Sequence, residues 1–151
     1  MKYLKISNPH SASGFTIVEI IVVMALILVL FGISAPFLYR FYNNFEVRSE
    51  RDSLVAYLRQ TRNISVADQQ QSNHGLYKTS TQYIIFKGSS YSDRDPYYDQ
   101  IFPRSTGVAV SGPSQIVFQR RSGRTPKVSY TLTSGGTSYV INVNEEGNIL
   151  W

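Results

Sequence analysis

The chain has 151 residues, a formal net charge of +5 and no cysteine. A chain of this length is expected to form about one domain, and the lack of cysteine excludes disulfide bonds and cysteine-held metal sites. Lys2 and Lys5 precede a long apolar stretch and Arg40 follows it, a distribution that modestly favours an N-terminus in the cytoplasm.

The apolar stretch follows a short polar leader. Residues 20–38 are apolar apart from Gly32, Ser34 and Pro36. A run of about 18 or more such residues is typical of a membrane-spanning helix. Glu19 stands out at the start of this run, because a carboxylate is costly to bury in lipid and usually has a partner there.

The residues before the apolar stretch form a motif, Gly14-Phe15-Thr16-Ile17-Val18-Glu19. With its basic leader, this motif resembles the precursor signature of type IV pilins and type II secretion pseudopilins. The resemblance implies that a prepilin peptidase cuts after Gly14 and that Phe15 becomes the N-methylated first residue of the mature chain. It also implies assembly roles for Glu19, which would meet the Phe15 ammonium of a neighbouring subunit, and for Pro36, which would bend or melt the helix in filaments.

Three other interpretations of this segment stay open. An ordinary secretory signal peptide would be cut near Ser34 or Ala35, although the apolar core is long for that and Glu19 is out of place. A plain single-span anchor would need no processing. Glu19 could also be a carboxylate that reaches the membrane surface without a further role.

Helical periodicity continues after the apolar stretch. Leu54, Leu58 and Thr61 recur on one side and charged residues fill the others, which predicts an amphipathic helix over a globular core. We therefore predict a leader at 1–14, a transmembrane and assembly helix at 15–38, an amphipathic helix at 39–72 and a β-sheet head at 73–151.

After residue 73 the hydrophobic pattern alternates with a period of two, as in β-strands. Residues 75–78 and 82–86 predict a hairpin, and residues 88–104 predict a long loop because they carry Pro96, Pro103 and many polar residues. Further strands are predicted at 107–110, 115–118, 127–132, 138–143 and 149–151. One helix followed by consecutive strands indicates an α+β fold, in which a long N-terminal helix with a membrane-spanning first half packs on a C-terminal antiparallel sheet.

The predicted head is similar to that of minor pseudopilins of the GspH/FimT type. The similarity rests on a basic stretch with Arg59 and Arg62, on Gly112-Pro113 before the strand at 116–118, and on a terminal hairpin with Glu146-Gly147-Asn148. It implies a structural filament subunit rather than an enzyme, held in the inner membrane by one span with its head in the periplasm or outside the cell. The implied partners are the prepilin peptidase, other pilin or pseudopilin subunits, an inner-membrane assembly platform and membrane lipid.

The sequence predicts no catalytic, metal or cofactor site. His74 is alone in a polar linker, and no nucleophile, base and orienting group can be assembled. Asp93, Asp95 and Asp99 could offer oxygens to a hard cation, but they lack the spacing of an EF-hand. Solvated loop carboxylates are the favoured interpretation.

A basic cluster flanks one predicted turn and contains Arg120, Arg121, Arg124 and Lys127. Such a cluster could hold the phosphates of DNA, with Tyr91, Tyr97, Tyr98 or Tyr130 stacking on bases if they lie nearby. A DNA-binding minor pilin of a DNA-uptake system is therefore the alternative function, with a precedent among FimT-like proteins. A solvated hairpin tip is the competing interpretation.

Overall fold

The computed structural model describes the backbone of residues 14–151 and the side chains of residues 14–32 and 44–151. Apart from Gly14, the predicted leader lies outside the described residues, as does the side chain of Pro36. The chain divides into two compact units, residues 1–38 and residues 39–151.

One helix, α1 (Ile17–Val66), precedes all the strands. Thr16 caps its start, because the Thr16 hydroxyl accepts a hydrogen bond from the Glu19 N–H at 3.3 Å. A threonine at the cap with a glutamate three residues later is the capping-box sequence, so the Thr16-Ile17-Val18-Glu19 motif also encodes a helix start.

Among the described residues, no helix combines the length and the apolar character needed to cross a membrane. The predicted span at 15–38 extends into residues 33–38, whose side chains lie outside the described part, and it stays a prediction.

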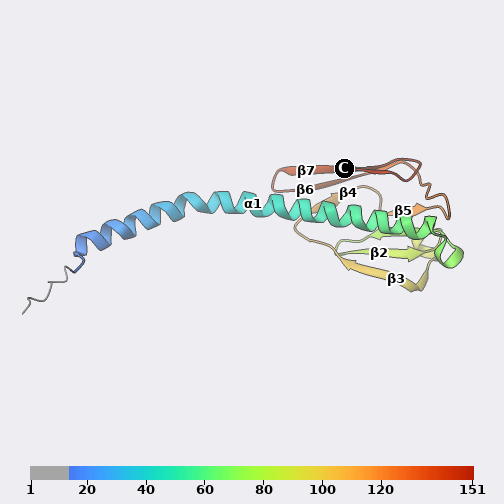
Figure 1. The fold of residues 1–151 in the computed structure, drawn as a ribbon, viewed down its shortest axis with the longest axis horizontal. Coiled ribbons are helices and arrows are strands. Elements are labelled where there is room, and N and C mark those ends of the chain that lie inside the picture. Colours follow the sequence, from blue (N-terminus) through green and yellow to red (C-terminus); the bar gives the residue numbers. More distant parts are fainter. Residues whose placement is uncertain (1–13) are drawn as a thin grey trace, which may run out of the picture. The chain divides into compact units, whose positions relative to one another are not determined.

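In residues 14–151, eight strands form two antiparallel sheets instead of the single sheet that we predicted (Figure 1). The first sheet has the order β3-β2-β1-β5, and its strands in chain order are β1 (His74–Lys78), β2 (Gln82–Lys87), β3 (Asp95–Pro103) and β5 (Gln115–Phe118). The second sheet has the order β4-β6-β7-β8, made of β4 (Ala109–Ser111), β6 (Val128–Ser134), β7 (Thr137–Val143) and β8 (Ile149–Leu150). Two short 3-10 helices, η1 (Gln69–Gln71) and η2 (Tyr91–Asp93), lie between these elements.

The core of the head forms where the C-terminal half of α1 meets both sheets. Val47, Leu54 and Leu58 from α1 are fully buried, as the predicted apolar stripe requires. They belong to one cluster with residues of both sheets, among them Leu76, Tyr83, Ile85, Tyr130, Leu132 and Ile141. Thr61 and Ser65 continue the same buried face with small side chains. The predicted α+β class, a helix packed on antiparallel strands, is confirmed.

The prediction of a long loop at 88–104 is wrong, because most of this segment is the strand β3. This strand pairs with β2 alone and is exposed along most of its length, so it lacks the alternation of apolar and polar residues that marks a half-buried strand. Its prolines, Pro96 and Pro103, are compatible with a strand at the edge of a sheet.

Candidate functional site

The N-terminal motif lies in the first turn of α1 and directly before it. Gly14 and Phe15 precede the helix, and Phe15 is 80% exposed. Glu19 is also exposed, in the first helical turn, where the aligned peptide dipoles favour a negative charge. Glu19 therefore has a local role in starting the helix, separate from any role in assembly.

A family comparison bears directly on this segment. Residues 9–35 match the family model described as the prokaryotic N-terminal methylation motif. The chain carries a type IV pilin-like signal. The match includes Gly14, Phe15 and Glu19, and it supports a pilin-like precursor that a prepilin peptidase processes. The comparisons with curated proteins and with solved structures gave no match.

Asp68 binds two of the four basic residues predicted to contact DNA. Arg120 donates hydrogen bonds through Nε to Asp68 Oδ1 and through Nη2 to Oδ2 at 3.0 Å, and Arg121 Nε donates to Oδ2 at 2.9 Å. The hydrogen bonds from Arg120 and then from Arg121 lower the pKa of Asp68 to about 2. An ionised carboxylate therefore offsets part of the positive charge of this turn.

The other two basic residues of the predicted cluster differ from this pair. Arg124 and Lys127 are exposed, and neither forms an ion pair with any carboxylate in the described part of the chain. Tyr130, which we considered as a stacking residue, is 1% exposed in the core and cannot reach a base. The four basic residues thus form a partly neutralised pair and two free cations.

A second charged cluster holds the connection between β3 and β4 against α1. The Glu50 carboxylate, 6% exposed, accepts hydrogen bonds from the Tyr83 hydroxyl at 2.8 Å and from the Ser105 N–H at 3.2 Å. Burial and the bond to Glu50 raise the pKa of Tyr83. Arg104 lies 3.9 Å from Glu50 and donates to the carbonyls of Thr79 and Val108, both at 2.8 Å. Because each member has partners within the head, this cluster is structural.

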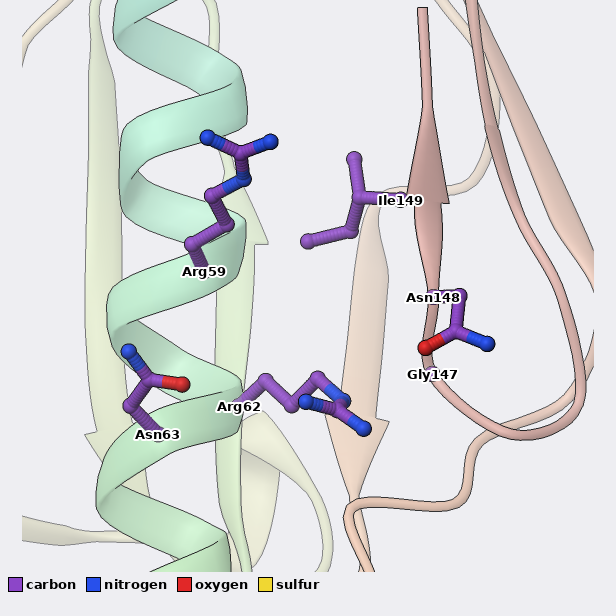
Figure 2. A pocket seen from close by; sticks show the side chains of 6 residues that line it. All are labelled: Arg59, Arg62, Asn63, Gly147, Asn148 and Ile149. Atoms are coloured by element: carbon purple, nitrogen blue, oxygen red, sulfur yellow. The ribbon is translucent and has the colours of Figure 1, made fainter.

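A pocket of about 220 Å³ lies between α1 and the turn that joins β7 to β8 (Figure 2). Arg59, Arg62 and Asn63 line it from the helix, and Gly147, Asn148 and Ile149 line it from the turn. We call this site the α1–turn pocket. Asn144 shapes the turn, because its side-chain oxygen accepts hydrogen bonds from the N–H groups of Glu146 at 3.1 Å and Asn148 at 2.8 Å.

Two arginines in the α1–turn pocket have neutral partners. The Arg59 guanidinium carbon lies 4.1 Å from the centre of the Trp151 ring, and Arg62 Nη2 donates to the Glu146 carbonyl at 3.4 Å. Arg62 Nε is buried and forms no hydrogen bond within the described part of the chain. Figure 2 shows the Arg62 side chain reaching from the helix toward Gly147 and Asn148.

Arg59 and Arg62 were predicted as part of a basic stretch, and no site was predicted for them. Their spacing of three residues along a predicted helix places them on one face and could have suggested a paired site.

The prediction that His74 lies in a linker is wrong, because His74 begins β1 and is 3% exposed, with Nε2 at 2.9 Å from Gln70 Oε1. Arg94 donates to Asp99 at 2.8 Å, so one of the three loop carboxylates is engaged by an arginine.

Proposed function

We propose that the protein is the precursor of a structural subunit, of the minor pseudopilin kind, in a type IV pilus-like or type II secretion filament. The observation that carries this proposal is the methylation motif at residues 9–35, which includes the start and most of the apolar first half of α1. In this proposal the chain is anchored in the inner membrane by residues 15–38, with its head in the periplasm or outside the cell. Its partners are the prepilin peptidase, other subunits, an assembly platform and lipid.

Mass spectrometry of the protein from its native host tests the processing step. We expect a mature chain that begins at Phe15 and carries one added methyl group. Gly14→Ala should slow the cut, whereas Ser13→Ala, one residue earlier, should be processed normally. A mature chain that begins after Ala35, or one that still begins at Met1, would end the pilin interpretation.

The assembly role of Glu19 needs a variant that separates charge from helix capping. Glutamine can replace glutamate in a capping box but cannot neutralise the Phe15 ammonium of a neighbouring subunit. Glu19→Gln should therefore be inserted and cleaved but should enter sheared filaments less than the unchanged chain, and Glu19→Val should behave likewise. Equal incorporation of Glu19→Gln would mean that the charge has no part in assembly.

A second candidate function is DNA binding, supported by the exposed and unpaired Arg124 and Lys127 in the described head. If this turn binds phosphates, Arg124→Glu with Lys127→Glu should abolish retardation of duplex DNA at low salt, and binding by the unchanged chain should weaken steeply with salt.

The ion pairs of Asp68 give a sharper test of the same idea. Asp68→Asn should free Arg120 and Arg121 and tighten DNA binding, more than Asp52→Asn does with the same change in charge. If the unchanged chain and Asp68→Asn both fail to retard DNA at low salt, the turn is a solvated hairpin tip.

A further inference from the structure

We propose that the α1–turn pocket binds an oxyanion, a single phosphate or carboxylate group, between Arg59 and Arg62. The pocket is smaller than the roughly 300–1,000 Å³ of sites that take drug-sized ligands, so one anionic group with few attached atoms fits its volume of about 220 Å³. This proposal is independent of the filament function.

The charge of the pocket favours an anion. Arg51, Arg94, Arg104, Arg120 and Arg121 each lie within 4.0 Å of a carboxylate oxygen. Arg59 and Arg62 have no such partner among the described residues, although they lie one helical turn apart and line one pocket. Two guanidinium groups on one side of a pocket repel each other, and an anion between them would relieve that repulsion.

Arg62 is held in place before any ligand arrives. A Cβ atom on Gly147 would come within 2.9 Å of Arg62 Nε, and one on Gly123 within 3.2 Å, so both glycines leave room for this side chain. The Thr125 N–H donates to the Glu145 carbonyl at 3.2 Å and ties the two glycine-containing turns together. A guanidinium fixed in this way loses little conformational entropy when it binds a phosphate or carboxylate.

One acidic side chain, Glu146, belongs to the turn that lines the pocket. Glu146 Oε2 lies 3.4 Å from the amide nitrogens of Asn144 and Asn148, and Glu146 forms no ion pair with either arginine. Its carboxylate therefore leaves both guanidinium groups available. It also sets a negative charge near the pocket, which an incoming anion must overcome.

Trp151 provides the readout, because it is the one tryptophan of the chain and its ring lies under the Arg59 guanidinium. The experiment is a fluorescence titration of the full chain in detergent micelles with inorganic phosphate, at constant ionic strength maintained with chloride. A second titration uses acetate. We expect a saturable change in Trp151 emission with phosphate, with acetate or with both, and the stronger of the two identifies the preferred oxyanion.

Variants assign the response to the pocket. Arg62→Gln and Arg59→Gln should each weaken the apparent affinity by about tenfold or more, because charge-assisted hydrogen bonds are the strong ones. Glu146→Gln should tighten binding. Arg121→Gln is the matched control, since that side chain is 73% exposed, is bound to Asp68 and carries the same charge.

Circular dichroism checks that each variant is folded, and Arg59→Gln, at an exposed helix position, keeps the test valid if Arg62→Gln unfolds. The proposal is overturned if neither anion gives a saturable response with the unchanged chain. It is also overturned if folded Arg59→Gln binds the anion with the same apparent affinity as the unchanged chain. A change in Trp151 emission with duplex DNA, but with neither phosphate nor acetate, would overturn it as well.

Discussion

At the scale of single residues, Asp68 links the end of α1 to the turn that carries Arg120 and Arg121. It also makes the free energy of unfolding depend on pH in the acid range. Its pKa is about 2 in the folded chain and about 3.9 in an unfolded one. A carboxyl group with a lowered folded pKa contributes stability that is present above the unfolded pKa and is lost as the pH falls.

We therefore predict that the free energy of unfolding decreases between about pH 4 and pH 2, and that Asp68→Asn removes part of this decrease. Urea unfolding across that range measures it. Asp52→Asn is the control, because the Asp52 side chain is 61% exposed. If the free energy of unfolding falls equally with pH in Asp68→Asn and in the unchanged chain, the ion pairs of Asp68 are contradicted.

Gly147 is the second residue whose replacement gives a clear prediction. An added Cβ would lie 2.1 Å from the Gly123 carbonyl oxygen, and the backbone has a φ of +77°. Gly147→Ala should cost about 1–2 kcal/mol of backbone strain and a further roughly 1–3 kcal/mol of overpacking. Gly136 is the matched control, since its φ is +84° but nothing lies within 4 Å of an added Cβ.

Thermal unfolding of the two alanine variants separates strain from crowding. Gly136→Ala should lose the strain term alone, so Gly147→Ala should be the less stable by about 1–3 kcal/mol. Equal losses would mean that the two turns are not in close contact, and the argument for a fixed Arg62 would fail with it.

At the scale of elements, the buried face of α1 is the part of the fold that the sequence predicted best. Leu58 is fully buried, and Leu58→Ala should lower the free energy of unfolding by about 2–5 kcal/mol. Ser49→Ala, at an exposed position of the same helix, should change it by about 0.5 kcal/mol or less. Chemical unfolding compares the two, and a small effect at Leu58 would contradict the helix-on-sheet core.

The strands divide into those that alternation could reveal and one that it could not. β5 was predicted with its observed bounds, and β6 and β7 were predicted to within two residues of theirs. Gly135 and Gly136 supply the positive φ angles that the two-residue turn between β6 and β7 favours. β3 was missed since an exposed edge strand has no buried face to create a pattern. The division into two sheets was also missed, because single strands do not reveal their partners.

The site was less predictable than the fold for the same reason. The methylation motif is contiguous in the sequence, so its residues could be identified directly. The α1–turn pocket joins residues 59–63 with residues 147–149, and their proximity depends on the whole path of the head. The pairing of Asp68 with Arg120 and Arg121 is equally distant in sequence.

At the scale of the whole molecule, the unit at residues 39–151 contains a core of its own, drawn from Val47 to Val143. We predict that a chain that begins at Asn43 folds without the apolar stretch, because it keeps the buried face of α1 and both sheets. Circular dichroism should show helix and strand with cooperative thermal unfolding. A spectrum of coil alone would mean that the head depends on the segment before it.

β3 lies at the open edge of its sheet, and this position bears on aggregation between copies of the chain. An open strand edge offers unpaired backbone groups on which a second chain can add a strand, and such edges are sites of aggregation. Pro96 and Pro103 each lack an N–H donor, and the pairing of β3 with β2 shifts register between Ile85 and Lys87. In the filament that we propose, these features would keep neighbouring heads from pairing their sheets, so that each subunit stays a separate folded domain.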